Sequence, residues 1–242
     1  MEDLAGQLEA QLRSVATPER AEHEKRYLKS DLSFLGATVW QIRSATREMV
    51  RGRELGHDEL IALVVDLWSA PVHERRMAAV FLLDRFAGLL GAEDLPLIER
   101  LVRESRTWAL VDGLATDVLG AMVLADAAAL AVPMDRWAAD DDFWVRRASL
   151  LAELRPIRDG APMEPFLARA DAMLDEREFF IRKAIGWVLR EAGKRRPDDV
   201  AAWLAPRTGR ASGVTMREAV KYLPADVATM LMDAYREKQP AA

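Results

Sequence analysis

An indole and a carboxylate stand four residues apart in the segment Trp108-Ala-Leu-Val-Asp112. On an α-helix this spacing puts Trp108 and Asp112 on the same face, one turn apart. The apolar pattern on both sides of the segment predicts that it is helical. A carboxylate next to an aromatic ring suits a site that holds positive charge, because both groups attract cations.

The same helical position recurs at an interval of 35–36 residues. Phe143 follows Trp108 by 35 residues, and Phe179 follows Phe143 by 36. The position of Asp112 is taken by basic residues in the neighbouring repeats, namely Arg76, Arg147 and Lys183. An acidic exception in a basic series is therefore the main indication of a functional site.

Two helices per 35–36 residues predict an all-α fold, an α-solenoid of the HEAT kind in which each helix pair stacks on the next. We expect one curved domain over residues 1–235 with a concave face, followed by a flexible tail at 236–242. Two helices are expected within residues 1–30, the second starting at Thr17-Pro18. Further helices are expected at 40–51, 57–68, 74–86, 94–104, 108–119, 141–154, 163–174, 179–187, 198–204 and 216–222.

The repeated position allows more than one interpretation. Phe143 and Phe179 could simply fill the core between layers of helices. A ladder of like charges costs energy unless it is neutralised, either by acidic side chains of neighbouring helices or by a bound anion. The tryptophans expected in the core, rather than at a ligand, are Trp40, Trp68, Trp137, Trp144 and Trp203.

A bound anion would be the phosphate backbone of DNA. The second helices of the pairs would then form a concave basic track of about the width of a duplex. The residues expected to bind DNA are Tyr27, Arg43, Arg76, Arg182, Lys183, Arg190, Lys194, Arg217 and Lys221. The net charge of −5 argues mildly against nucleic-acid binding by the whole surface, but a local basic stripe is compatible with it.

Composition excludes several classes of function. The chain has no cysteine, so disulfides and thiolate chemistry are excluded, and its three histidines are scattered, which indicates neither a metal nor a cofactor. The N-terminus lacks the regions of a signal peptide, and the most apolar run, 121–134, is interrupted by Asp126 and too short to span a bilayer. We expect a monomeric cytoplasmic protein that is associated with the nucleoid when on DNA and not with a membrane.

Several motifs together resemble those of the AlkD-like DNA alkylation repair proteins. The resemblance runs from about residue 20 to 225, and the segment from Phe179 to Glu191 is its most specific part. The motifs are Tyr27-x-Lys, Phe34-Leu-Gly36, Leu67-Trp68-Ser69, Trp108-x-x-x-Asp112, Trp144-Val-Arg-Arg147, Phe179-Phe-Ile-x-Lys-Ala-Ile-Gly-Trp187-x-Leu-Arg-Glu191 and Arg217-Glu-Ala-x-Lys-Tyr222.

The resemblance implies a HEAT-like fold and a DNA glycosylase that releases N3- or N7-alkylated purines from double-stranded DNA. It also implies catalytic roles for Trp108, Asp112 and Trp187, with Arg147 beside them. One departure is visible: the family often has a second aromatic before the first tryptophan, where this chain has Thr107. That difference bears on substrate range or rate.

Two other functions are compatible with the sequence. The first is a non-catalytic protein that binds damaged or branched DNA, because some relatives have lost catalysis and the fold alone does not guarantee activity. The second is a protein-interaction scaffold, which is the commonest use of α-solenoids.

Overall fold

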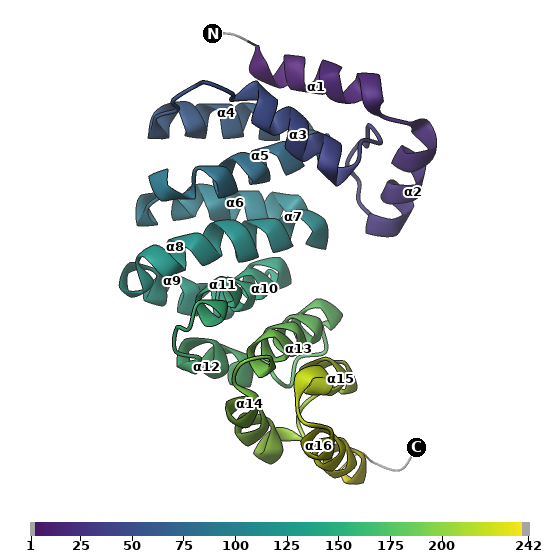
Figure 1. Ribbon diagram of the computed structural model, residues 1–242, viewed down its shortest axis with the longest axis vertical. Helices are drawn as coiled ribbons and strands as arrows, with labels where there is room; N and C mark the ends of the chain where they lie inside the picture. The colour runs from purple at the N-terminus through teal and green to yellow at the C-terminus, as the bar shows by residue number, and fades with distance from the viewer. Residues whose placement is uncertain (1–2, 239–242) are drawn as a thin grey trace. The chain divides into compact units, whose positions relative to one another are not determined.

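The computed structural model describes residues 3–238, and its regular elements over that range are helices (Figure 1). The only strand-like pairing in the described chain is an isolated bridge between Ser33 and Val72. The predicted all-α fold is therefore confirmed. The chain divides into two compact units, Met1–Met122 and Val123–Ala242, and each is described by itself. A single domain with a concave face stays a prediction.

The N-terminal unit is packed around α5, which contacts α1, α3, α4 and α7. Its helices are α1 (Leu4–Val15), α2 (Pro18–Leu28), α3 (Val39–Met49), α4 (His57–Ser69), α5 (His73–Arg85), α6 (Leu95–Ser105) and α7 (Trp108–Gly113), with short 3₁₀ turns at Ala87–Leu89 and Ala92–Asp94. The predicted helices of this unit are confirmed to within a few residues.

A buried carboxylate fixes the connection between α2 and α3. Glu74 of α5 is fully buried and accepts hydrogen bonds from the backbone N–H groups of Leu35, Gly36 and Ala37, at 2.7–3.3 Å. Gly36 has a φ of +96°, and a Cβ there would lie 2.0 Å from the carbonyl oxygen of Thr17. The close approach requires glycine, because any side chain would clash. The tight connection around residues 33–36 is thus held against α5.

The helix that starts at Trp108 continues further than its pattern predicts. After α7 the chain forms a π-helical segment, η3 (Leu114–Leu119), and then α8 (Gly120–Ala125), so the helix ends six residues beyond the predicted end at 119. The stretch Trp108–Ala125 is long and apolar enough to cross a bilayer by length and composition alone. Half of it is buried, and α7 packs against α5 and α6, a pattern that core helices share.

The C-terminal unit is packed around α13, the longest of its helices, which contacts α10, α11, α14 and α15. The helices are α9 (Ala127–Ala138), α10 (Phe143–Leu151), α11 (Leu154–Arg158), α12 (Glu164–Ala172), α13 (Phe179–Gly193), α14 (Pro197–Leu204), α15 (Gly213–Ala219) and α16 (Ala225–Glu237), with 3₁₀ turns at Ala205–Arg207 and Val220–Tyr222.

Several parts of this unit differ from the sequence prediction. The pattern does not predict α9, which carries Pro133 in its interior, α11 or α16. Because α16 runs through Glu237, the tail predicted to start at residue 236 is wrong for Arg236 and Glu237. Lys238 forms a turn, and the rest of that tail, residues 239–242, lies outside the described residues.

The aromatic residues expected in the core divide into two groups. Trp68, Trp137, Trp144 and Trp203 are buried, as predicted. The prediction is wrong for Trp40, which is 72% exposed on α3, because the buried face of this helix carries Ile42, Ala45 and Thr46 instead.

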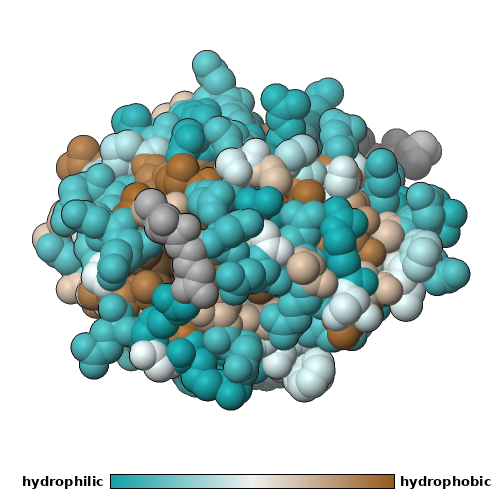
Figure 2. All heavy atoms as spheres, turned by 90° about the horizontal axis from the view of Figure 1, so that it is seen from above, coloured by the Kyte–Doolittle hydropathy of each residue, from teal (hydrophilic) through white to brown (hydrophobic). Residues whose placement is uncertain are grey.

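Phe179 is not a core residue either. It is 53% exposed at the start of α13, and Phe143 is partly exposed. On the face of the molecule in Figure 2, hydrophilic side chains surround the exposed apolar ones.

Candidate functional site

Helix α7 presents Trp108 and Asp112 on a partly exposed face. Both residues are partly exposed, whereas Leu110 and Val111 between them are fully buried. The helix begins at Trp108, two residues after Arg106, which caps α6 in the left-handed conformation with a φ of 46° and turns the chain towards α7. The burial of the intervening residues fixes which side of α7 faces outward.

A cavity of about 490 Å³ adjoins Trp108 in the N-terminal unit. The rings of Tyr27 and Trp108 both line it and meet edge to face, with centroids 5.8 Å apart. Asp112 does not line the cavity, but Ala109 and Gly113, on the adjoining face of α7, do. The indole of Trp108 therefore lies at the boundary between the face of Asp112 and the cavity.

The other two expected catalytic residues belong to the C-terminal unit. Trp187 is partly exposed on α13, so it is not sunk in the core. Arg147 of α10 is only 3% exposed; its Nη1 donates a hydrogen bond of 2.5 Å to the carbonyl of Phe180, and its guanidinium lies over the Phe180 ring. The convergence of Trp108 and Asp112 with Trp187 and Arg147 stays a prediction.

An aromatic cluster surrounds Phe180, the ring against which the Arg147 guanidinium lies. Phe143 stacks on Phe180 with ring centroids 6.1 Å apart. The ring centroids of Trp144 and Phe180 are 4.8 Å apart. Phe179 contacts Phe180 edge to face. The cluster joins the first turns of α10 and α13, which explains why an aromatic recurs at this place in two successive repeats.

Glu218 neutralises part of the positive charge of the basic residues in the C-terminal unit. It lies 35 residues after Lys183, at the same repeated position, so Asp112 is not the only acidic residue there. Lys183 Nζ lies 2.6 Å and Lys221 Nζ 2.8 Å from Glu218 Oε1, and Arg190 pairs with the other oxygen. The interval that revealed Asp112 also marks Glu218, so the sequence held the signal.

The pKa of Glu218 reflects these partners. Burial would raise it, but the hydrogen bonds of Lys183 and Lys221 and the charges of Lys183 and Arg190 outweigh burial and lower the pKa to about 2. Neutralisation of the basic ladder by a neighbouring helix is thus confirmed for Lys183. Binding of DNA by Lys183, Arg190 and Lys221 stays a prediction, and it would have to compete with this carboxylate.

Three further cations expected at DNA have protein partners. Arg76 donates to the Glu104 carbonyl at 2.8 Å, and burial lowers its pKa. Arg182 donates to the Glu176 carbonyl at 2.7 Å. Lys194 lies 2.9 Å from the carboxylate of Glu191 and over a tyrosine ring.

The remaining expected DNA contacts are exposed, as Lys194 and Lys221 also are. Tyr27 is 65% exposed, and Arg217 and Arg43 are exposed, the latter with its guanidinium 4.3 Å from the centre of the Phe81 ring.

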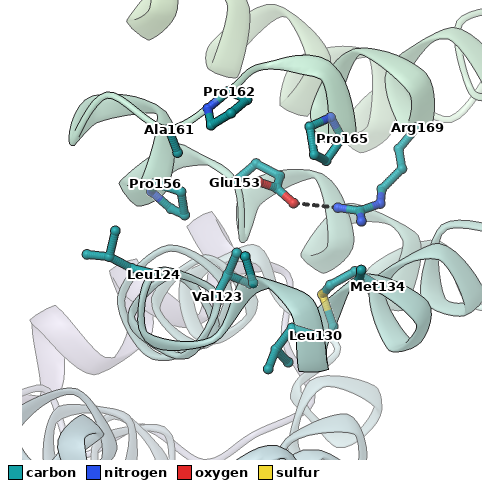
Figure 3. A pocket seen from close by; sticks show the side chains of 12 residues that line it. Val123, Leu124, Leu130, Met134, Glu153, Pro156, Ala161, Pro162, Pro165 and Arg169 are labelled. Atoms are coloured by element: carbon teal, nitrogen blue, oxygen red, sulfur yellow. Dashed lines mark hydrogen bonds and ion pairs between the residues drawn. The ribbon is translucent and has the colours of Figure 1, made fainter.

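A second cavity, of about 230 Å³, lies in the C-terminal unit (Figure 3). Its lining is largely apolar, with Leu130 and Met134 facing the buried ion pair of Glu153 and Arg169. Arg169 donates to Glu153 at 2.5 Å and to Asp135 at 2.8 Å. Burial raises the pKa of Glu153, and Arg169 opposes that rise. Because its charged groups are paired with each other, this cavity offers a ligand little beyond apolar contact.

Residues 8–223 match the protein family described as DNA alkylation repair enzyme. The chain belongs to this family. No curated protein matches it.

Three solved structures are similar to this family member. A protein of Enterococcus faecalis described as a predicted DNA alkylation repair enzyme is 21% identical, with a TM-score of 0.78 over 87% of this chain and 97% of the other. AlkD2 of Streptococcus mutans is 19% identical, with a TM-score of 0.61 over 85% and 100%. The protein smu.31 of S. mutans UA159 is 16% identical, with a TM-score of 0.55 over 92% and 100%. At these identities the likeness shows the fold.

The residues that the sequence predicts to be catalytic differ in how exposed they are. Trp108, Asp112 and Trp187 are partly exposed, whereas Arg147 is covered by Phe180. Trp108, Asp112 and Trp187 are therefore accessible without rearrangement of the protein, whereas Arg147 is not.

Proposed function

We propose that the protein is a DNA glycosylase that excises cationic N3- or N7-alkylated purines, such as 3-methyladenine and 7-methylguanine, from double-stranded DNA. Membership in the DNA alkylation repair enzyme family supports action on alkylated DNA. The observation that carries the finer proposal is the pair of Trp108 and Asp112, both partly exposed one turn apart on α7.

The chemistry of the lesion suits a carboxylate. Alkylation at N3 or N7 gives the purine a positive charge, so it is already a good leaving group. When the glycosidic bond breaks, its electron pair stays with the purine, which becomes neutral, and positive charge moves to the deoxyribose. Asp112 would stabilise this charge and orient a water molecule, whose oxygen bonds to C1′ while its proton passes through Asp112 to solvent.

The size of this effect matches the class of substrate. At about 4 Å and an effective dielectric of about 20, one carboxylate stabilises a cation by about 4 kcal/mol. That corresponds to roughly a thousandfold in rate. The factor is useful for a nucleotide that is already labile and too small for an undamaged one, so selectivity would come largely from the instability of the lesion.

The proposal assigns the other residues to binding. The faces of Trp108 and Trp187 would flank the sugar or base, where they favour positive charge. Arg147 would bind a phosphate next to the lesion. Because Arg147 is only 3% exposed, this role requires its guanidinium to move out from under Phe180.

The direct test is release of base from duplex DNA that contains N7-methylguanine. The wild type should release the base, and Asp112→Asn should lose most of the activity, by about a hundredfold or more. Asp84→Asn is a matched control, because Asp84 is also a partly exposed carboxylate in the N-terminal unit, on α5.

The same assay separates the alternatives. DNA binding without base release, unaffected by Asp112→Asn, would indicate a non-catalytic DNA-binding protein. Absence of both release and DNA binding would indicate the scaffold function. Release that Asp112→Asn and Asp84→Asn reduce equally would contradict the assigned role of Asp112.

A further inference from the structure

The cavity beside Trp108 has the dimensions of a ligand site. Its volume of about 490 Å³ lies within the range of roughly 300–1,000 Å³ of small-molecule pockets. Aromatic rings of Tyr27, Phe81 and Trp108 and apolar side chains such as Met77 line most of it. Flat aromatic walls favour a flat aromatic ligand, because rings gain stacking contacts that aliphatic groups do not.

Two buried polar atoms of the same lining have no hydrogen-bond partner in the described chain. One is Nδ1 of His73, a residue that is 97% buried, and the other is Nε of Arg20. His73 stacks on Phe34 with centroids 4.7 Å apart, which holds the imidazole in place. An unpartnered buried polar atom is destabilising, and a ligand group that bonds to it would remove this cost.

The charges of the Arg20 guanidinium and the His73 imidazole limit the kind of ligand that the cavity can bind. Burial lowers the pKa of His73, so its imidazole is neutral at pH 7 and offers one acceptor and one donor nitrogen. The guanidinium of Arg20 is a donor only, and its charge is paired with Glu24. The carboxylates of Glu24 and Asp117 also line the cavity, so it suits a neutral molecule with a mixed hydrogen-bonding edge rather than an anion.

We propose that this cavity binds the free alkylated purine after its glycosidic bond has been cleaved. A purine combines a planar ring with an edge that carries both acceptors and donors, which matches the aromatic lining and the unpartnered nitrogens of Arg20 and His73. This inference rests on the proposed function for the origin of the base. Asp112 lies outside the lining, so chemistry and base binding occur on adjoining faces of α7.

The test is calorimetric titration of the protein with free 7-methylguanine and 3-methyladenine in the absence of DNA. The wild type and Asp112→Asn should both show saturable binding of the bases. Val39→Trp should abolish it, because Val39 lines the cavity and is 51% exposed, so a larger side chain fills the space without disturbing the core. Val65→Trp, at another partly exposed valine outside the lining, is the matched control and should bind normally.

A separate variant tests the proposed hydrogen bond between His73 and the ligand. His73→Phe keeps a ring against Phe34 but removes the nitrogens, so it should weaken binding by roughly three- to tenfold. No saturable binding by the wild type would overturn the inference, and so would equal affinities of Val39→Trp and Val65→Trp. If the wild type releases a base from DNA but does not bind it free, this inference falls and the proposed function stands. If it binds the base but releases none, the glycosylase proposal falls alone.

Discussion

Lys183 of α13 and Glu218 of α15 form an ion pair of 2.6 Å between two helices that are neighbours in the chain's repeat. The two residues occupy the same repeated position, 35 residues apart. Lys221 and Arg190 share the same carboxylate. One buried acid thus neutralises part of the basic series that the sequence assigns to DNA, and this leads to predictions for both binding and stability.

Removal of this carboxylate should strengthen DNA binding. In Glu218→Gln, Lys183, Arg190 and Lys221 lose their shared counter-charge and become available to phosphates. We expect roughly a two- to tenfold higher affinity for duplex DNA at low salt and a steeper dependence on salt concentration. Fluorescence anisotropy over a salt series measures both, with Glu164→Gln, at an exposed carboxyl of α12, as the charge-matched control. Equal affinities of the two variants would mean that these cations do not contact DNA.

The same carboxyl should make the protein sensitive to acid. The folded-state pKa of Glu218 is about 2, below the ordinary value of 4.5, so its contribution to stability is present above pH 4.5 and is lost as the pH falls towards 2. Urea unfolding of the wild type and Glu218→Gln should show a stability difference at pH 7 that shrinks through this window. Parallel curves down to pH 2 would contradict the assignment.

Gly36 should tolerate no side chain. Its φ of +96° disfavours other residues, and a Cβ would lie 2.0 Å from the Thr17 carbonyl oxygen. We expect Gly36→Ala to lower the free energy of unfolding by at least about 2 kcal/mol. Gly52→Ala separates the two causes, because Gly52 has a φ of +70° but open space around it, and should cost about 1–2 kcal/mol. The comparison requires only urea denaturation.

Thr107 should be replaceable with a gain in stability. It is 1% exposed, and its hydroxyl has no hydrogen-bond partner in the described chain. Thr107→Val removes this hydroxyl at nearly constant volume. The free energy of unfolding should therefore increase by about 1 kcal/mol, and the urea midpoint should rise with it. Thr215→Val should have the opposite sign, because the Thr215 hydroxyl donates to the Arg182 carbonyl at 3.1 Å. Destabilisation by both changes would mean that the Thr107 hydroxyl has a partner.

Breaking the ion pair of the second cavity should be costly. Arg169→Met leaves the carboxyl of Glu153 buried without its partner, and we expect a loss of about 3–5 kcal/mol. The double variant Glu153→Leu with Arg169→Met should recover most of this loss, since no buried charge remains. Thermal unfolding of the wild type, the two single variants Arg169→Met and Glu153→Leu, and the double variant measures the coupling, and additive losses would argue against a direct interaction.

Local chemistry explains why much of the fold could be predicted from the sequence. Thr17 caps α2 with its side chain, and Pro18 follows at the first helical position, so the predicted start at Thr17-Pro18 is confirmed. Helix α9 was missed because Pro133, which usually ends a helix, lies in its interior. Trp40 was misplaced because residue type indicates burial only on average, and α3 turns its other side to the core.

One part of the candidate site can be predicted because it depends only on local spacing along a helix. The four-residue spacing sets Trp108 and Asp112 on one face whatever surrounds them. By contrast, the cavity beside Trp108 brings together α2, α3, α5 and α7, and no short-range pattern indicates such a meeting. Burial of Arg147 under Phe180 likewise depends on the packing of α10 against α13.

The π-helical segment Leu114–Leu119 lies directly after Gly113. A π turn closes its hydrogen bonds over five residues instead of four, so it holds extra chain within an unbroken helix. Loss of one residue from this segment would turn it into ordinary α-helix. Because five α residues turn through about the same angle as six π residues, α8 would keep nearly its present orientation about the helix axis. Single-residue deletions between 114 and 119 should therefore disturb the packing of the following helix less than deletions in its α-helical parts, where each would rotate the chain that follows by roughly 100°.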